Sequence, residues 1–483
     1  MISDFKCVRK FLVAASIFWL LSGYQANAQS SKDIKITIHL RGVYESKISL
    51  LGLSSRTFKP ITEVSGIKNG ETTKIMVSKA SLPGEFVLRF DYKENEASTP
   101  YPSEKYIFIY NQDLELWVSP VYCNNADSTW FQPNEKENST FVEFSKANGK
   151  QKEKLGLLQN FLMNYDETKS KLFKEGTKEY EQRRQTYNQW LKDRTTQDRA
   201  LFVSTLYGFQ YVPQIPFEGS ETDRIYNLIN HYFDGMDFND SLLIKTSEIN
   251  KWMDGYVNLY GQLSTTAALR DSLFPLAGKT AIEKAKTGHP KVYGWMVDYF
   301  YNGYESNAID AGMKILEPYL NDPNCLTSKR QEIARRLKGM ETLVAGTKAP
   351  DIALTDPEGK RFKLYEYQPK RKYILVLFWS ADCSHCVETV DAVYPWLQQT
   401  ENKAKVSVVA ISLDETDTEI KKWDQKIVSL GGWKNLRGEA GVRSKVANDY
   451  FILATPVMVL LDSETKEIVA MPNTPQELKA AVK

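Results

Sequence analysis

The sequence predicts a multidomain protein with an N-terminal antiparallel β sandwich or barrel, a central all-α domain and a C-terminal α/β domain. Its 483 residues exceed what one hydrophobic core usually covers, so about three domains are expected. Polar and apolar residues alternate along 29–145, which is typical of half-buried strands. Apolar residues recur at helical spacing through 146–343, and in 344–483 nearly continuous apolar runs alternate with helical segments.

The segment 1–28 has the features of a cleavable signal peptide. Basic residues precede the apolar run 11–21, and Ala-Asn-Ala at 26–28 supplies the small side chains that signal peptidase requires, so we expect cleavage before Gln29. The alternative is an uncleaved membrane anchor, but the apolar run is short for a membrane span. We therefore predict an exported protein of the periplasm or cell envelope, with no membrane span after cleavage.

Composition argues against several kinds of partner and cofactor. With 62 Lys and Arg against 60 Asp and Glu, the chain has no excess charge that would attract nucleic acid or an anionic membrane. A zinc site needs about four ligands, and only one of the four histidines lies near a cysteine pair. No metal and no other cofactor are therefore expected.

Removal of the signal peptide would leave four cysteines, two of which form a closely spaced pair. In an oxidising compartment Cys383 and Cys386 are a candidate redox pair. Cys123 and Cys325 lie in different predicted domains, and the sequence leaves open whether they pair. As free thiols they would be small buried hydrophobic residues rather than reactive groups.

In the first domain, alternation predicts strands near 33–40, 85–90, 105–110 and 114–118, with a turn at 111–113. An antiparallel sandwich or barrel accommodates several short strands of this kind.

In the central domain, leucines and aromatic residues recur at helical spacing along 155–162, 226–233 and 252–260. We interpret these stripes as core packing rather than as a ligand site. The segment 278–280, Gly-Lys-Thr, is similar to the end of a phosphate-binding loop, but Leu273 stands where the leading Gly should be. We therefore interpret this segment as a helix boundary.

The C-terminal domain is expected to begin near Gly346 with two short strands joined by a turn that contains Pro and Gly. Three apolar runs follow at 373–379, 406–411 and 457–461, with helical segments between them. Strands that are buried on both faces have this pattern, so the domain is predicted to be α/β.

The pair Cys383 and Cys386 lies where the first of these strands leads into a helix. Apolar residues at positions i+4, i+7 and i+11 from Cys386 place its sulfur on the buried face of that helix. Cys383 lies at the helix N-terminus, where unpaired N–H groups and the helix dipole stabilise a thiolate. This arrangement predicts an exposed nucleophile at Cys383 and a sheltered resolving thiol at Cys386.

Pro456 directly precedes the last apolar run, and proline is tolerated at the start of a strand because it has no N–H to pair. An ordinary strand start would explain Pro456 alone. If the Thr455–Pro456 bond is cis, however, the loop can approach the cysteines and present backbone groups to an incoming peptide.

Three segments of the C-terminal domain together resemble a known pattern. The segment 349–360 is similar to the opening hairpin, 375–386 to the active-site strand with its Cys-Ser-His-Cys motif, and 454–462 to the cis-proline segment of the TlpA and ResA families. The resemblance implies a thioredoxin-like fold over most of the domain. The whole layout resembles exported proteins of Bacteroidetes in which a small β domain of the DUF4369 type precedes the catalytic domain.

This resemblance implies disulfide exchange with protein dithiol or disulfide substrates and with a redox partner in the envelope. By residue match, Cys383 attacks a substrate disulfide, Cys386 resolves the mixed disulfide, and Pro456 shapes the peptide groove. Cys383 and Cys386 would form the redox-active disulfide, and Thr455 and Trp379 are expected to contribute to substrate binding.

The chain departs from the family pattern around the pair. Leu377 replaces the buried acid that helps to deprotonate the second cysteine in thioredoxins. Thr389 stands where members resembling ResA carry Glu, and Glu388 is expected to be a solvated surface charge. Asp382 replaces the usual Trp before the first cysteine, and its charge should oppose thiolate formation.

His385 should act in the opposite direction to Asp382. A His between the cysteines can donate a hydrogen bond to the thiolate or carry positive charge beside it, as in DsbA-type oxidases. We hypothesise that His385 makes the dithiol more oxidising than a Pro-containing motif would. The alternative is a partly exposed His without a role.

Two other functions are alternatives. Peroxiredoxins share the scaffold, but 379–382 lacks the Pro that they carry ahead of the peroxidatic cysteine. The second alternative is a non-enzymatic envelope protein that binds a protein or a glycan and carries a redox domain. The sequence favours no direction of exchange and no oligomeric state.

Overall fold

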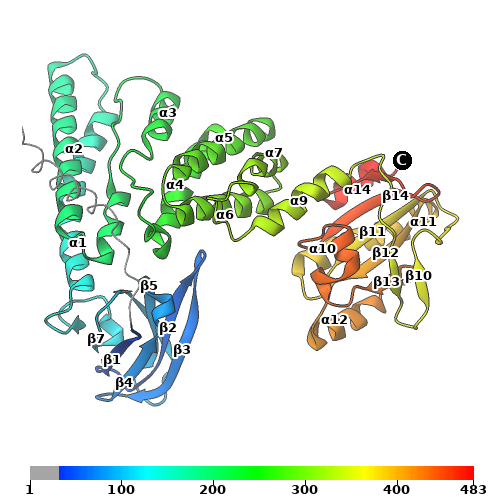
Figure 1. Cartoon of the computed structure of the whole chain (residues 1–483), viewed down its shortest axis with the longest axis horizontal. Helices are drawn as coiled ribbons and strands as arrows, with labels where there is room; N and C mark the ends of the chain where they lie inside the picture. Colours follow the sequence, from blue (N-terminus) through cyan, green and yellow to red (C-terminus); the bar gives the residue numbers. More distant parts are fainter. Residues whose placement is uncertain (1–31) are drawn as a thin grey trace, which may run out of the picture. The chain divides into compact units, whose positions relative to one another are not determined.

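The computed structural model describes residues 32–483, so the predicted signal peptide lies outside the described residues. The chain divides into two compact units, one that ends at Met296 and one that begins at Val297. The first contains a β-rich region followed by helices, and the second contains helices followed by a sheet domain (Figure 1). The predicted multidomain architecture is confirmed. Within the described part of the chain, no helix is both long and apolar enough to cross a bilayer.

The β-rich region consists of two four-stranded sheets, β3-β2-β5-β6 and β4-β1-β7-β8. The strands are β1 (Ile34–Leu40), β2 (Glu45–Ser54), β3 (Thr57–Lys68), β4 (Thr72–Val77), β5 (Gly84–Lys93), β6 (Tyr101–Ile109), β7 (Leu114–Val118) and β8 (Trp130–Phe131). Both sheets contribute buried side chains to one core, as in a sandwich. Unlike the antiparallel expectation, β1 and β7 pair in parallel, because these strands are not joined by a hairpin that would force the opposite direction.

The helical region begins earlier than predicted, because α1 (Glu137–Met163) starts within the segment assigned to the β domain. Its first residues are polar but buried, since they bond to distant parts of the chain. Asn138 exchanges hydrogen bonds with the backbone of Phe108 on β6, and Glu137 accepts from the N–H of Phe202 at 3.0 Å. Partners of this kind leave no apolar periodicity in the local sequence.

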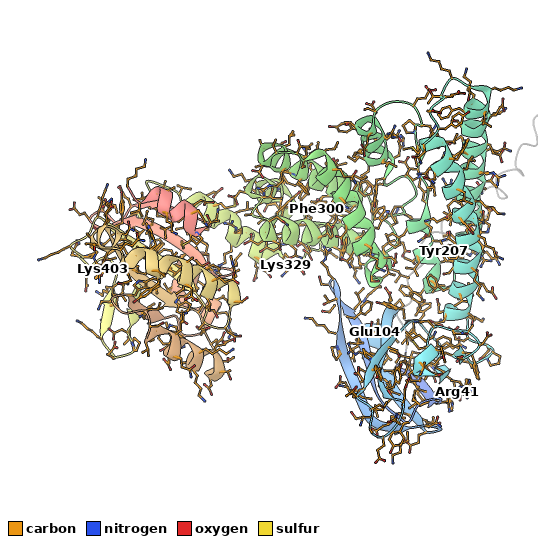
Figure 2. All side chains as sticks on the ribbon, turned by 180° about the vertical axis from the view of Figure 1, so that it is seen from behind. Arg41, Glu104, Tyr207, Phe300, Lys329 and Lys403 are labelled. Atoms are coloured by element: carbon orange, nitrogen blue, oxygen red, sulfur yellow. The ribbon has the colours of Figure 1, made fainter. Side chains whose placement is uncertain are left out.

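Seven further helices with clear bounds lead to the C-terminal sheet domain, together with the one-turn α8 (Glu317–Leu320). They are α2 (Lys171–Gln197), α3 (Glu221–His231), α4 (Glu248–Leu263), α5 (Ala267–Lys286), α6 (Pro290–Ser306), α7 (Asp310–Ile315) and α9 (Arg330–Thr342). Tyr207, labelled in Figure 2, stacks on Phe144 of α1 with ring centroids 3.7 Å apart. The segment 278–280 lies inside α5, so the predicted helix boundary there is wrong. Gly278 is buried, so this face of α5 packs into the core and the helix continues through the segment.

The C-terminal domain has a five-stranded sheet with the order β13-β12-β11-β14-β15 and a separate hairpin. The strands are β9 (Ala353–Thr355), β10 (Arg361–Lys363), β11 (Tyr373–Trp379), β12 (Val406–Ser412), β13 (Lys434–Arg437), β14 (Val457–Asp462) and β15 (Ile468–Ala470). The helices are α10 (Ser384–Gln398), α11 (Thr400–Lys405), α12 (Asp417–Ile427), α13 (Lys445–Asp449) and α14 (Pro475–Ala481). The three apolar runs are therefore strands β11, β12 and β14, as predicted.

Strand β11 is buried on both faces. Ile374, Val376 and Phe378 pack into a core shared with the hairpin and α13. The alternate residues, among them Leu377 and Trp379, pack into a second core with α10, α12 and α14. The second core also contains Cys386. The residues of β11 that alternate onto this face, Leu377 and Trp379 among them, therefore share a core with the cysteine.

Candidate active site

Helix α10 begins directly after the turn that follows β11, and its N-terminus carries both cysteines. Cys383 is the N-cap residue of α10, and its Sγ accepts a hydrogen bond from the N–H of Cys386 at 3.2 Å. This contact places the sulfur at the positive end of the helix dipole, which favours a thiolate. Both cysteines are free thiols in the structure, Cys383 half-buried and Cys386 fully buried.

Cys386 lies in the apolar core, as its position on the buried stripe predicted. Burial, together with the neighbouring Cys383, raises the pKa of Cys386 from its ordinary 9.0 to about 12. Its Sγ donates a hydrogen bond to Oγ1 of Thr455 at 3.2 Å, and this contact opposes part of the rise. Leu377, at the position where thioredoxins carry an acid, is fully buried in the same core.

The loop before β14 lies against both sulfurs. The Thr455–Pro456 bond is cis, and the carbonyl oxygen of Thr455 lies 4.0 Å from Sγ of Cys383. The structure thus brings together Cys383, Cys386 and the Thr455–Pro456 dipeptide from two distant segments. Their roles in catalysis and substrate binding stay predictions.

Trp379 was expected to contribute to substrate binding. Its side chain is fully buried in the core that contains Cys386. A ring with no accessible surface does not contact a substrate, so the prediction that Trp379 binds substrate is wrong. The reason is that β11 is buried on both faces, so its last residue, Trp379, also packs into a core before the chain leaves the strand at Ser380.

Charged side chains surround the N-terminus of α10. Asp382 forms an ion pair with Nζ of Lys422 on α12. Nδ1 of His385 lies 3.7 Å from Oε2 of Glu388, and the side chain of His385 is 72% exposed. The described contacts of His385 include no hydrogen bond to either sulfur, and its effect on the dithiol stays a hypothesis.

Comparison with known proteins identifies this domain. Residues 345–470, which include both cysteines and Pro456, match the AhpC/TSA family. The thiol-disulfide oxidoreductase ResA of Bacillus thuringiensis subsp. konkukian is 26% identical over 138 residues, which cover 26% of this chain and 69% of the relative. ResA of Bacillus anthracis is 27% identical over 149 residues, which cover 30% of this chain and 79% of the relative. The C-terminal domain is a thioredoxin-like oxidoreductase domain of the AhpC/TSA family.

Two solved structures are similar to parts of the chain. A thioredoxin-like protein from Bacteroides caccae is 22% identical and covers 56% of this chain and 96% of its own, with a TM-score of 0.38. A domain of a possible thiol-disulfide isomerase from Cytophaga hutchinsonii is 32% identical and covers 29% of this chain and 90% of its own, with a TM-score of 0.25. The predicted resemblance to ResA is confirmed for the oxidoreductase domain, and the DUF4369 resemblance of the β-rich region stays a prediction.

The sequence interpretation missed Asp414, which holds the turn before Cys383 in the oxidoreductase domain. Its carboxylate is 1% exposed and accepts hydrogen bonds from Oγ of Ser380 at 2.5 Å and from the N–H of Ala381 at 3.0 Å. Oγ of Ser412 donates a further bond at 2.7 Å. The sequence signal that could have located Asp414 is an acidic residue just after β12. Because β11 and β12 are parallel neighbours, their carboxyl ends meet, and this residue lies near the turn that follows β11.

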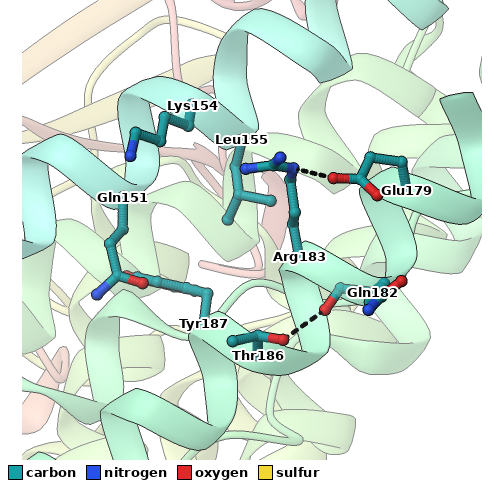
Figure 3. Close-up of a pocket in the computed structure, with 8 residues that line it drawn as sticks. All are labelled: Gln151, Lys154, Leu155, Glu179, Gln182, Arg183, Thr186 and Tyr187. Carbon is teal, nitrogen blue, oxygen red and sulfur yellow. Dashed lines mark hydrogen bonds and ion pairs between the residues drawn. The ribbon is translucent and has the colours of Figure 1, made fainter.

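Outside the oxidoreductase domain, a cavity of about 330 Å³ lies between α1 and α2 (Figure 3). Its Arg183 is paired with Glu179 at 2.5 Å, and most of its other lining side chains are polar. Over residues 32–483, no group of three or more His, Cys, Asp or Glu side chains could hold a metal ion.

Proposed function

We propose that this protein is an exported oxidoreductase that exchanges disulfides with protein substrates through Cys383 and Cys386. The observation that carries the proposal is the asymmetry of the two sulfurs. Sγ of Cys383 is half-buried at the N-terminus of α10 and accepts an N–H hydrogen bond, whereas Cys386 is fully buried and its pKa is raised to about 12. An attacking thiolate that is more accessible than the second thiol is what stepwise exchange requires.

In the first step, the thiolate of Cys383 attacks one sulfur of a substrate disulfide. A new bond forms between that sulfur and Sγ of Cys383, the substrate disulfide breaks, and its other sulfur leaves as a thiolate that takes up a proton. Cys386 then loses its proton and attacks Sγ of Cys383. This second step forms the Cys383–Cys386 disulfide and breaks the mixed disulfide, and the substrate sulfur leaves as a thiolate that takes up a proton. The reverse sequence oxidises a substrate dithiol.

The loop at Thr455 supports both steps. The carbonyl of Thr455 lies beside Cys383, where an extended substrate would pass, and its hydroxyl contacts Cys386. Export is supported by the features of 1–28, and N-terminal sequencing of the mature protein is expected to begin at Gln29.

Replacement of the second thiol tests the proposal. In the Cys386→Ala variant the first step proceeds but the mixed disulfide cannot be resolved, so substrate proteins should remain attached to Cys383. Affinity capture from the envelope, followed by non-reducing electrophoresis, measures these adducts. The Cys383→Ala/Cys386→Ala variant is the matched control and should capture none. Equal capture by the two variants would contradict the proposal.

A further inference from the structure

Asp382 directly precedes the nucleophile, and its charge is paired with a lysine from another element. Nζ of Lys422 on α12 forms an ion pair with Oδ1 of Asp382, which lies 40 residues away in the sequence. The hydrogen bond and the charge of Asp382 raise the pKa of Lys422, so the lysine stays protonated. An unpaired carboxylate at this position would disfavour a thiolate at Cys383, whereas a paired one has a much weaker net field.

A second pair joins α12 to α10 itself, further from the cysteines. Nζ of Lys426, one turn after Lys422 on α12, lies 2.6 Å from Oδ1 of Asp391 on α10. Asp391 lies about two turns along α10 from Cys383. Both pairs connect α12 to the α10 segment, but only the Lys422 pair lies next to the nucleophile.

The other charged groups near this end of α10 have partners of their own. His385 and Glu388 lie 3.7 Å apart, and Asp414 accepts the hydrogen bonds of the turn that precedes Cys383. On α12, Oε2 of Glu419 accepts the backbone N–H groups of Glu415 and Thr416 at 2.9 Å each. Lys422 is the cation that forms an ion pair with Asp382.

We propose that Lys422 is a positioning residue that sets the redox potential of the Cys383–Cys386 couple by neutralising Asp382. This inference rests on the proposed disulfide exchange. When glutathione reduces the couple, the disulfide accepts two electrons and becomes a dithiol, while two glutathione thiols are oxidised to one glutathione disulfide. Lys422 favours the reduced side, because it removes the repulsion between the Asp382 carboxylate and the Cys383 thiolate.

Charge-removing variants of the full mature chain test this inference. In Lys422→Met, the equilibrium constant for reduction by glutathione and the alkylation rate of Cys383 by iodoacetamide at pH 7 should each fall about threefold, the order expected for one exposed charge. Lys426→Met removes the matched pair and should change neither quantity. Asp382→Asn should shift both in the opposite direction, and the Asp382→Asn/Lys422→Met variant should return to the wild-type values.

Two results would overturn the inference. One is an equal shift in Lys422→Met and Lys426→Met, which would mean that the pairs act only by fastening α12. The other is a double variant that keeps the shift of Lys422→Met, which would mean that Asp382 is not the group on which the lysine acts. Failure of the proposed function itself would look different, because the wild-type pair would then reach no equilibrium with glutathione.

Discussion

Cys386 must lose its proton in a core that offers it a hydroxyl but no described carboxylate. Its hydrogen-bond partner is Thr455, and Leu377 occupies the position of the acid that thioredoxins use. In a mixed disulfide Cys383 is no longer a free thiol, but burial, the largest cause of the raised pKa of Cys386, remains, so few molecules carry its thiolate at neutral pH. Below the pKa, the thiolate fraction rises tenfold for each pH unit, so the resolving step should be slow at neutral pH and accelerate with alkalinity.

We therefore expect the release of a small thiol from a mixed disulfide at Cys383 to accelerate about tenfold per unit between pH 7 and pH 9, without a plateau. Thr455→Val removes the hydroxyl that can donate to the thiolate and should slow release severalfold at each pH. Thr455→Ser keeps the hydroxyl and serves as the control. Stopped-flow measurement of the released thiol gives these rates, and a plateau near pH 8 would contradict the raised pKa of Cys386.

Residues of the candidate site differ in how far the sequence could locate them. Cys383, Cys386 and Pro456 belong to short motifs whose neighbours predict a helix N-terminus and a strand start. Asp414 and Lys422 belong to no such motif, because their partners lie 33 and 40 residues away and are brought near only by the fold. Trp379 was misplaced because it lies close to the cysteine motif, although the apolar run to which it belongs predicts a buried side chain.

Helix α9 is fastened to the segment that leads to the Thr455–Pro456 loop. A Cβ added to Gly339 of α9 would lie 2.8 Å from Cβ of Phe451, closer than packed side chains tolerate. Arg335, one turn earlier, donates hydrogen bonds to the carbonyl oxygens of Ala447 and Ile452 at 2.9 and 2.7 Å. The close approach therefore requires glycine at position 339.

Gly339→Ala is expected to destabilise the protein by about 1–3 kcal/mol, because Phe451 must move to admit the methyl group. Gly303→Ala in α6 is the matched control, since an added Cβ there meets nothing within 4 Å and the site is exposed. That change should stabilise by up to about 1 kcal/mol through helix propensity. Urea unfolding followed by circular dichroism measures both, and equal effects would contradict the packing argument.

Elements with a clear hydrophobic pattern were predictable, and strands that are short or mostly exposed were not. Strands β11, β12 and β14 are buried on both faces and so appear as apolar runs. Strand β3 is mostly exposed, and β13 and β15 span only 4 and 3 residues, so none of them has a clear pattern. The early start of α1 was missed for a different reason, because its first turn is held by long-range polar contacts.

At the level of the whole chain, the compact unit that contains the dithiol begins at Val297, within α6, and so includes α9. The sequence placed a domain boundary at 343/344, between this helix and the sheet. The contacts of Gly339 and Arg335 indicate that α9 contributes to the stability of the oxidoreductase domain.

A fragment of residues 290–483 should therefore unfold at a higher temperature than a fragment of residues 346–483. The shorter fragment loses the two hydrogen bonds of Arg335 and exposes the surface under α9. Because 1 kcal/mol shifts Tm by about 2–4 °C in a domain of this size, we expect a difference of roughly 5 °C or more. Calorimetry of the reduced fragments measures it, and equal Tm values would show that α9 is dispensable.

Two buried indoles give the oxidoreductase domain an optical signal. Trp379 and Trp423 share a core with Cys386, and the Nε1 of each has no hydrogen-bond partner among the described residues. An indole in such surroundings emits at short wavelength, and a disulfide nearby quenches indole emission. Oxidation of the pair should thus dim the blue edge of the protein's fluorescence, which makes turnover visible without a label.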